Sequence, residues 1–264
     1  MKVLLILMTA LFAGSNSDAA ETGFLDRVAR VEGTDYRYQI YVPADYATRT
    51  DWPVILALHG SGERGSDGLR PTLVGLAPAI RANPARWPAL VVFPQCPAEQ
   101  AWNGPAAAIA LTSLDQTMRD FHCDPDRVYL TGLSMGGNGA WFLAYRDPER
   151  YAALAPICGW VLHRSSPGLP DGELVVHDAR HGTAADSLAF LARRLQRLPT
   201  WIFHGEEDPV VNVEHSRQAH LALGRLGADV HYSELPGIGH GAWDPAYASG
   251  GFIEWLFTQR RRPR

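Results

Sequence analysis

The sequence predicts a single α/β domain built on a mostly parallel, doubly wound β-sheet flanked by helices. The first observation behind this prediction is a series of continuous apolar runs, typical of strands that are covered on both faces. The second is that helical patterns fall between these runs. The third is the length of 264 residues, which suits one large domain and is divided by no linker-like stretch or internal repeat.

The expected strands are of two kinds. Residues 36–42 alternate in character and are rich in tyrosine, which favours an antiparallel strand with one exposed face. The remaining strands are expected at residues 54–59, 89–93, 128–131, 153–158, 200–204 and 230–235. Helices are expected at residues 106–121, 136–146, 187–198 and 214–226. In a sheet of this kind, functional side chains lie at the carboxyl ends of the strands.

Residues 160–198 interrupt this alternation of strands and helices. The segment opens with a stretch rich in glycine, proline and serine at residues 164–172, before helical periodicity returns. Because the segment follows the carboxyl end of a predicted strand, a long connection there would pass over the carboxyl edge of the sheet. We therefore expect either a small cap over the functional site or a solvated loop.

The N-terminus has the layout of a secretory signal peptide over residues 1–19. Lys2 gives a short positive start, residues 3–14 are apolar, and Ser17 and Ala19 fit the small-x-small rule at a cleavage site. An uncleaved anchor or a buried first helix is the alternative, although the apolar run is short for a membrane span. We expect a mature domain from residue 20 to 264, without stable membrane insertion, that is exported and located in the periplasm.

The charged residues exclude several classes of protein. A formal net charge of −4 argues against a nucleic-acid binder, which usually shows a basic excess. Lys2 is the one lysine among 24 basic residues. Loss of a signal peptide would leave no lysine, and therefore no Schiff-base, pyridoxal-phosphate, Ser–Lys or P-loop chemistry.

The three cysteines, Cys96, Cys123 and Cys158, are expected to be buried free thiols. One disulfide is the alternative in an exported protein, with one thiol left over. The expected strands put Cys96 and Cys158 at the ends of non-adjacent strands and Cys123 at the opposite edge, whereas a disulfide spans only about 7 Å between Cα atoms. No CxxC or Cys/His spacing suggests zinc.

A candidate nucleophile, Ser134, lies where an apolar strand meets a helix. The sequence there is Gly132-Leu-Ser134-Met-Gly136, which matches G-x-S-x-G in the strand–turn–helix context that gives this motif meaning. Such a turn strains the backbone of the serine and holds its hydroxyl group out from the turn, where a substrate can reach it. Glycines flank it because side chains there would collide as strand and helix approach each other. The N-terminus of the following helix favours a developing anion.

A nucleophilic serine needs a base, and the base needs a residue that orients it. Of the ten histidines, His240 is the candidate base, because glycines on both sides let its loop come close to the serine. Asp208 is the favoured acid because it follows a strand that ends in His-Gly, and Glu206 and Glu207 are the alternatives. The chain order serine, acid, histidine is the one expected of a particular hydrolase fold.

The first edge loop, residues 60–65, is expected to supply an oxyanion hole. The backbone N–H of Ser61, together with that of Met135, is the predicted donor pair. The same loop spells the G-x-G-x-x-G dinucleotide fingerprint, which requires an acidic residue about 20 positions later. No acidic residue occurs between Asp67 and Glu99, so we do not expect nicotinamide binding or any other cofactor.

Three tryptophans fall in edge loops. Trp102, Trp160 and Trp243 either line a groove for an aromatic or polymeric substrate or serve ordinary packing. The adjacent Glu63 and Arg64 are expected to form an ion pair that braces the first edge loop, with substrate contact as the alternative.

Two further features offer weaker functional signals. His177 and His181 have the i, i+4 spacing of helical metal ligands, but no third ligand is evident, so no metal site is predicted. The arginine-rich end, residues 260–264, is most simply a solvated tail.

Taken together, these motifs make the chain resemble the α/β-hydrolase superfamily, in particular the secreted esterases and predicted peptidases related to feruloyl esterases and dienelactone hydrolase. The resemblance spans residues 24–257. Its more specific marks are the stretches at residues 59–65, 94–97 with Trp102, and 239–247. After Gly159 the chain departs from the pattern, because similar proteins continue with a short Gly/Asp loop. The resemblance therefore carries no substrate assignment.

The resemblance also implies roles for individual residues. It makes Ser134, Asp208 and His240 the triad, and Ser61 and Met135 the oxyanion donors. We expect a serine hydrolase that cleaves small-molecule or polysaccharide-linked carboxylic esters through an acyl-enzyme, without metal or organic cofactor. A serine peptidase on the same fold is the first alternative, and a non-catalytic binding protein is the second. The sequence gives no indication of the oligomeric state.

Overall fold

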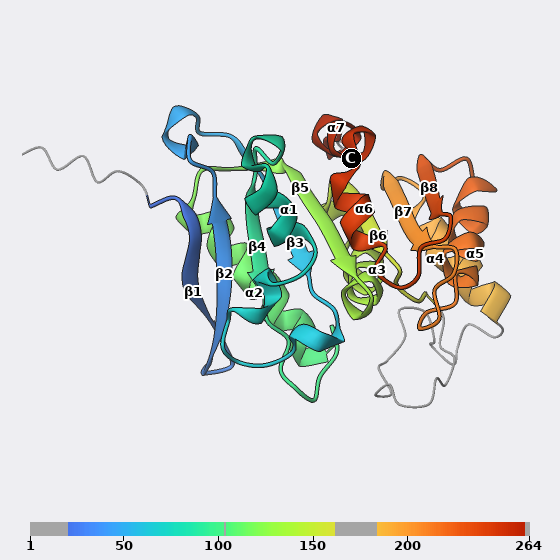
Figure 1. The fold of residues 1–264 in the computed structure, drawn as a ribbon, viewed down its shortest axis with the longest axis horizontal. Coiled ribbons are helices and arrows are strands. Elements are labelled where there is room, and N and C mark those ends of the chain that lie inside the picture. Colours follow the sequence, from blue (N-terminus) through green and yellow to red (C-terminus); the bar gives the residue numbers. More distant parts are fainter. Residues whose placement is uncertain (1–20, 103, 162–183, 262–264) are drawn as a thin grey trace, which may run out of the picture.

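The computed structural model describes residues 21–102, 104–161 and 184–261. The strands among them form one eight-stranded sheet in the order β1-β2-β4-β3-β5-β6-β7-β8 (Figure 1). Their bounds are β1 Gly23–Val31, β2 Thr34–Val42, β3 Trp52–Leu58, β4 Leu90–Pro94, β5 Cys123–Leu133, β6 Ala153–Ile157, β7 Thr200–Gly205 and β8 Val230–Leu235. The pairs β1–β2 and β2–β4 are antiparallel, and every other pair is parallel. The predicted fold class is confirmed.

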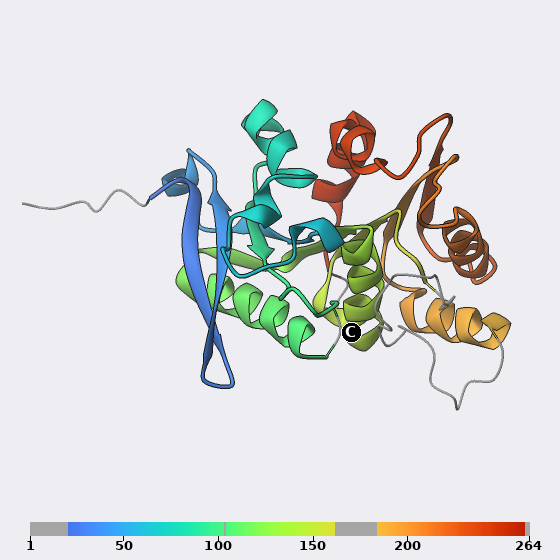
Figure 2. The same cartoon turned by 60° about the horizontal axis from the view of Figure 1, so that its bottom comes forward.

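Helices cover both faces of this sheet (Figure 2). Their bounds are α1 Leu76–Ala82, α2 Gly104–Asp120, α3 Met135–Arg146, α4 Ala184–Leu195, α5 Glu214–Gly224, α6 Trp243–Ala248 and α7 Gly250–Thr258. The helices α2, α3, α4 and α5 contribute to the core on one face, and α1, α6 and α7 contribute to the core on the other.

Strand β3 shows how the sequence produces these two cores. All of its residues are buried, as the apolar run predicted. Val54 and Leu56 join the core beneath α2 and α3, whereas Ile55 and Ala57 join the core beneath α1, α6 and α7. Successive side chains of a strand point to opposite faces, so a sheet with two covered faces requires an unbroken apolar run.

Among the described residues, one strand and three α-helices were not predicted from the sequence: β1, α1, α6 and α7. Strand β1 lies at the edge of the sheet and carries several charged residues, so it lacks the apolar signal of the central strands. It joins β2 through the two-residue turn Glu32-Gly33, in which both residues have positive φ angles, 48° and 83°. This geometry matches a tight hairpin turn.

Two predicted segments lie wholly or largely outside the described residues. The predicted signal peptide, residues 1–19, is one of them. Of the predicted cap at residues 160–198, the described parts are Trp160, Val161 and the residues from Ala184 onward, which begin helix α4. Within the described ranges, no helix is long and apolar enough to cross a membrane.

Candidate active site

Ser134 occupies the turn between β5 and α3. It has a φ angle of 53° and a ψ angle of −117°, a backbone conformation that non-glycine residues seldom adopt. Its N–H donates to the carbonyl of Ile157 at the end of β6, over 2.9 Å. The neighbouring strand therefore holds the strained turn in place.

The glycines around Ser134 are required by close backbone contacts. A Cβ atom on Gly132 would lie 2.2 Å from the carbonyl oxygen of Gly136, and one on Gly136 would lie 2.0 Å from the carbonyl oxygen of Leu58. The predicted collision between strand and helix is therefore correct for Gly132. For Gly136 the obstacle is the backbone of β3.

His240 connects Ser134 to a carboxylate. Its Nε2 lies 2.9 Å from the Ser134 hydroxyl oxygen, and its Nδ1 lies 2.7 Å from Oδ2 of Asp208. An ionised carboxylate only accepts hydrogen bonds, so Nδ1 carries the proton and Nε2 is free to accept from the serine. The side chain of Asp208 is fully buried, and that of His240 is 19% exposed.

Asp208 is held in its ionised form by several donors. Burial raises the pKa of this carboxyl group, but hydrogen bonds from His204, from His240 and from the N–H groups of Val210 and Val211 outweigh burial and hold the pKa well below its usual range. The two backbone N–H groups donate to Oδ1 over 2.8 and 2.9 Å. Asp208 can therefore face an imidazolium as a carboxylate near neutral pH.

His204 is a residue of this network that the sequence analysis missed. Its Nε2 lies 2.9 Å from the Val211 carbonyl and 3.2 Å from Oδ2 of Asp208, and its Nδ1 lies 2.7 Å from the Ser216 hydroxyl. Its side chain is fully buried. The sequence contained a signal for it, because a histidine at the end of an apolar strand must find buried hydrogen-bond partners.

The alternative acids do not contact His240. The carboxylate of Glu206 accepts from the N–H of Gly237 over 3.3 Å, and Glu207 lies in the same exposed turn. Of the three acidic residues after β7, Asp208 is the one whose side chain turns inward to the histidine.

The two predicted oxyanion donors begin two helical segments beside Ser134. Ser61 is the first residue of a short 3₁₀ turn after β3, and Met135 is the first residue of α3. The N–H groups in the first turn of a helix have no acceptor within that helix. A Cβ atom on Gly60 would lie 3.6 Å from that of Ser134, so the two segments adjoin at the serine.

The first edge loop is supported by a buried histidine and a buried tryptophan. His59 lies with its Nδ1 2.6 Å from the Gly60 carbonyl, and its Nε2 accepts from the N–H of Cys96 over 2.9 Å. Trp102 donates from its indole N–H to the His59 carbonyl over 2.9 Å and is 1% exposed. The substrate-lining role predicted for Trp102 is therefore wrong, because this side chain is enclosed by the protein.

The predicted ion pair between Glu63 and Arg64 is also wrong. The Glu63 carboxylate faces the backbone of Gly60, whereas Nη2 of Arg64 lies 2.9 Å from Sδ of Met135. Adjacent residues in this tight turn point in different directions, so their opposite charges do not meet.

The other two tryptophans are partly exposed. The Trp243 ring meets the His240 imidazole edge-on, with 5.6 Å between ring centroids. Trp160 packs against the core, and its carbonyl accepts from the side chain of Asn138 over 3.0 Å. Of the three tryptophans, Trp243 is the one that directly contacts the proposed base.

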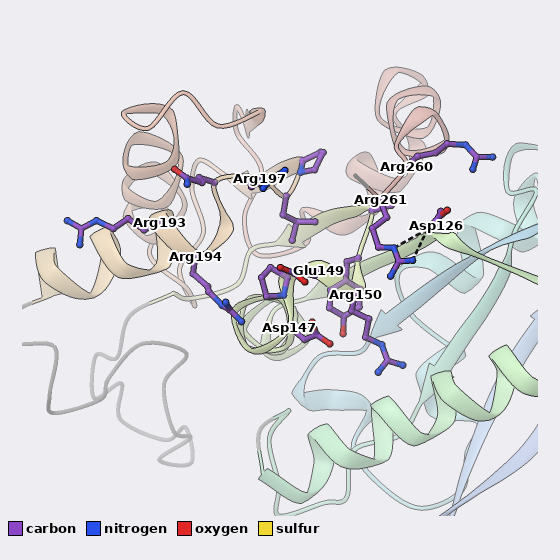
Figure 3. A pocket seen from close by; sticks show the side chains of 15 residues that line it. Asp126, Asp147, Glu149, Arg150, Arg193, Arg194, Arg197, Arg260 and Arg261 are labelled. Carbon is purple, nitrogen blue, oxygen red and sulfur yellow. Dashed lines mark hydrogen bonds and ion pairs between the residues drawn. The ribbon is translucent and has the colours of Figure 1, made fainter. Parts of the chain in front are cut away.

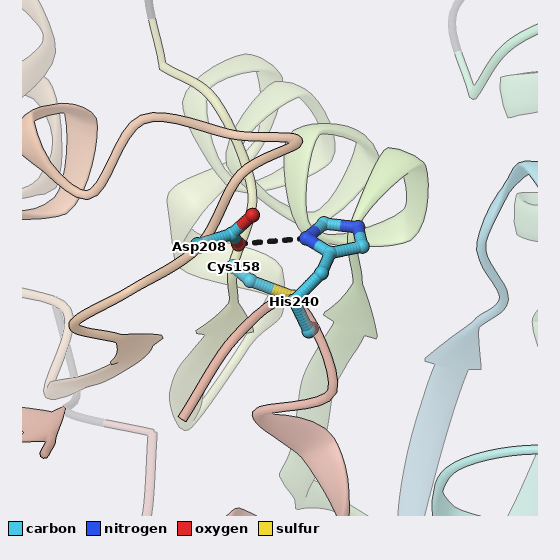
Figure 4. Close-up of side chains that lie close together, drawn as sticks. All are labelled: Cys158, Asp208 and His240. Atoms are coloured by element: carbon cyan, nitrogen blue, oxygen red, sulfur yellow. Dashed lines mark hydrogen bonds and ion pairs between the residues drawn. The ribbon is translucent and has the colours of Figure 1, made fainter. Parts of the chain in front are cut away.

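Cys158 lies beneath the His240 loop (Figure 4). Its backbone has a φ angle of 41°, and its thiol lies 3.4 Å from the His240 carbonyl. The sulfur, a carboxylate oxygen of Asp208 and a ring nitrogen of His240 all lie within 4.8 Å of one another, a set that could hold a metal ion. However, the Asp208–His240 hydrogen bond already engages two of these ligands, and burial raises the pKa of the Cys158 thiol, which favours its neutral form.

The remaining candidates lie away from Ser134 or outside the described residues. Cys96, Cys123 and Cys158 are all free thiols, as expected, but only Cys96 and Cys158 are buried, and Cys123 is partly exposed. The pair His177 and His181 lies outside the described residues.

A second region, a cavity of about 700 Å³, is shown in Figure 3. It lies at the amino ends of the strands, whereas Ser134 follows the carboxyl end of β5. Its lining includes Asp126, near the start of β5, and Pro199, just before β7. Six arginines also line it: Arg150, Arg193, Arg194, Arg197, Arg260 and Arg261. The described part of the predicted solvated tail is tied down here, because Arg261 donates to Asp126 over 2.8 Å. This cavity belongs to the amino ends of the strands and forms no part of the candidate site.

A mostly parallel sheet with a strained serine between strand and helix, joined by hydrogen bonds to a histidine and a carboxylate on later loops, defines an α/β-hydrolase. The model of the prolyl oligopeptidase family matches residues 110–253, more than half of the sequence. The chain belongs to this family.

Individual relatives point to esterases. A thermostable esterase of known structure is 30% identical, with a TM-score of 0.74 over 90% of this chain and 63% of that chain. A ferulic acid esterase from Anaeromyces mucronatus has the same fold, with a TM-score of 0.61 at 17% identity over 89% of this chain and 90% of its own. An uncharacterized secreted protein of Arthroderma benhamiae is 25% identical over 80% of this chain, which spans 23% of that protein. The predicted resemblance to esterases of the α/β-hydrolase superfamily is confirmed.

Proposed function

We propose that this chain is an esterase-type serine hydrolase that cleaves carboxylic esters with Ser134, His240 and Asp208 as its triad. The observation that carries the proposal is the unbroken line of hydrogen bonds from the Ser134 hydroxyl through His240 to Asp208. A histidine whose Nε2 is free and lies next to the hydroxyl can act as the general base that activates the serine. The similarity to a thermostable esterase supports the same reaction.

The geometry translates into a two-stage mechanism. Ser134 Oγ attacks the ester carbonyl while His240 Nε2 takes the hydroxyl proton, and Asp208 stabilises the resulting imidazolium. The N–H groups of Ser61 and Met135 donate to the oxyanion of the tetrahedral intermediate. His240 then protonates the leaving alcohol, which departs and leaves an acyl-enzyme. In the second stage water takes the place of the alcohol, and the same groups release the carboxylic acid.

The proposed substrates are small-molecule or polysaccharide-linked esters. The ferulic acid esterase similarity supports this class, and the partly exposed Trp243 beside His240 offers an aromatic surface at the reacting bond. We also propose that the protein is exported to the periplasm after removal of residues 1–19, which N-terminal sequencing of the exported protein would check.

The decisive experiment compares the wild-type protein with Ser134→Ala on nitrophenyl esters of increasing acyl length. We expect the wild type to hydrolyse them and the variant to lose activity by about 10⁶-fold, with an unchanged Tm. Hydrolysis by the alanine variant at a wild-type rate would show that the nucleophile is another residue. Cleavage of labelled peptides but of no ester would identify the protein as a peptidase instead.

A further inference from the structure

Arg64 places a positive charge beside the side chain of Met135, one of the two proposed oxyanion donors. It lies in the loop after β3, three residues beyond Ser61, and its Nη2 lies 2.9 Å from Sδ of Met135. The guanidinium also lies close enough to the Cys96 thiol to hydrogen-bond with it. Both of these partners are neutral sulfur groups, which are weak acceptors.

The charge of Arg64 has no counter-ion among the described residues. Its neighbour Glu63 is directed to the Gly60 backbone, and the Nε of Arg64 is buried without a hydrogen-bond partner. Arg70, on the same loop, forms an ordinary ion pair with Asp67 over 3.2 Å. A buried guanidinium nitrogen with no acceptor is costly, so its presence here calls for an explanation.

The neighbours of Arg64 already respond to its charge. The pKa of His59 is lowered to about 4, first by burial and in addition by Arg64, against the opposing effect of the Gly60 carbonyl. The pKa of Cys96 is raised to about 12 by burial, and Arg64 reduces that rise. Both effects are those expected of a positive charge next to the first edge loop, although burial is the larger cause of both shifts.

We propose that Arg64 is a positioning residue of the oxyanion site, which fixes Met135 through its sulfur contact and supplies an uncompensated positive charge for the tetrahedral oxyanion. The inference rests on the proposed ester hydrolysis. With Nε buried and Nη2 against Met135, the guanidinium acts through space and not as a direct ligand of the substrate. Arginine suits this place because its guanidinium is more weakly hydrated than an ammonium group.

The test compares Arg64→Met, which removes the charge, with Arg64→Lys, which keeps it. For Arg64→Met we expect kcat on nitrophenyl acetate to fall by roughly 10- to 30-fold with KM within about twofold, since a charge near the oxyanion acts on the transition state and not on the ground state. Arg64→Lys should retain most of kcat. Arg30→Met, which removes one charge from an exposed side chain on β1, is the matched control and should behave as the wild type.

A second readout does not depend on turnover. A phenylboronic acid forms a negatively charged tetrahedral adduct with the serine, so its Kd should weaken in Arg64→Met by about the same factor as kcat falls. If no ester is hydrolysed at all, the proposed function fails, while the boronate Kd still tests Arg64. If Arg64→Met does not fold, Arg64→Gln serves as the uncharged variant.

Three results would overturn the inference. The first is an unchanged kcat and boronate Kd in Arg64→Met. The second is an equal loss in the methionine and lysine variants, which would indicate a steric role alone. The third is a change confined to KM, which would indicate contact with the substrate.

Discussion

The two halves of the candidate site are built by different forces. The position of Ser134 is set by close contact between backbone segments. A Cβ atom on Gly136, for example, would lie only 2.0 Å from the carbonyl oxygen of Leu58. Around Asp208 and His240 the position is set by side-chain hydrogen bonds that His204 and two backbone N–H groups complete. Close packing tolerates almost no added volume, whereas a same-shape exchange in a hydrogen-bond network adds no volume and costs only the hydrogen bond that is lost.

This difference predicts two kinds of variant. Changes that add volume to the packed backbone around Ser134 should damage the fold and the activity together. Changes in the Asp208–His240 half should damage the activity and leave the fold nearly intact.

In the hydrogen-bonded half, the largest effect is expected for Asp208→Asn. The amide keeps the shape but cannot hold the proton on His240 Nδ1 as a carboxylate does, so kcat should fall by about 10⁴-fold. Thermal melting should show a folded protein. Glu206→Gln changes an exposed carboxylate of the same turn and should leave kcat unchanged. A larger loss of kcat in Glu206→Gln than in Asp208→Asn would show that Glu206 is the acid of the triad.

Gly136→Ala tests the close-packed half. The added methyl group would meet the carbonyl oxygens of Leu58 and His59 at 2.0 and 2.7 Å, and neither backbone can move without displacing β3. We expect a loss of about 3–5 kcal/mol in the free energy of unfolding, measured in urea, together with loss of activity.

The matched control for that variant is Gly224→Ala at the end of α5. A Cβ there would meet nothing within 4 Å, so the substitution should be neutral or should stabilise the protein by up to about 1 kcal/mol. Similar stabilities for the two alanine variants would show that the turn is not held by steric contact.

The sequence predicted the parts of the site that depend on local pattern. Ser134 was predicted from the strand, turn and helix pattern around it, and His240 from the glycines on both sides of it. Both signals lie in consecutive residues. The contacts between distant parts of the chain were not predicted. Arg64 meets Met135, 71 positions away, and Trp102 meets His59, 43 positions away, which is why the ion pair and the substrate-lining role assigned to them were wrong.

His204 was missed for a different reason. It is only four residues from Asp208, but it lies near the end of a strand whose apolar run indicated burial. The histidine indicated that buried hydrogen-bond partners exist, but not which residues they are. A single buried histidine in such a run is as compatible with a core position as with a hydrogen bond to a functional carboxylate. Only the structure, which places its Nε2 beside Asp208, separates the two.

The smallest predicted effect concerns His59, the buried polar group in the Ser134 half. Its pKa in the folded protein is about 4, against 6.5 for an unperturbed histidine, so between these values the unfolded chain binds a proton that the folded protein does not. The stability that His59 contributes is therefore complete above about pH 6.5 and falls as the pH drops toward 4, by about 3 kcal/mol in total. In His59→Gln this part of the pH dependence should be absent, so urea unfolding at pH 7 and pH 4 should show a smaller loss for the variant than for the wild type. Equal losses of unfolding free energy in the two proteins would mean that His59 takes up its proton in the folded state. The loop that carries Ser61 would then open to water far more readily than the close-packed turn at Ser134.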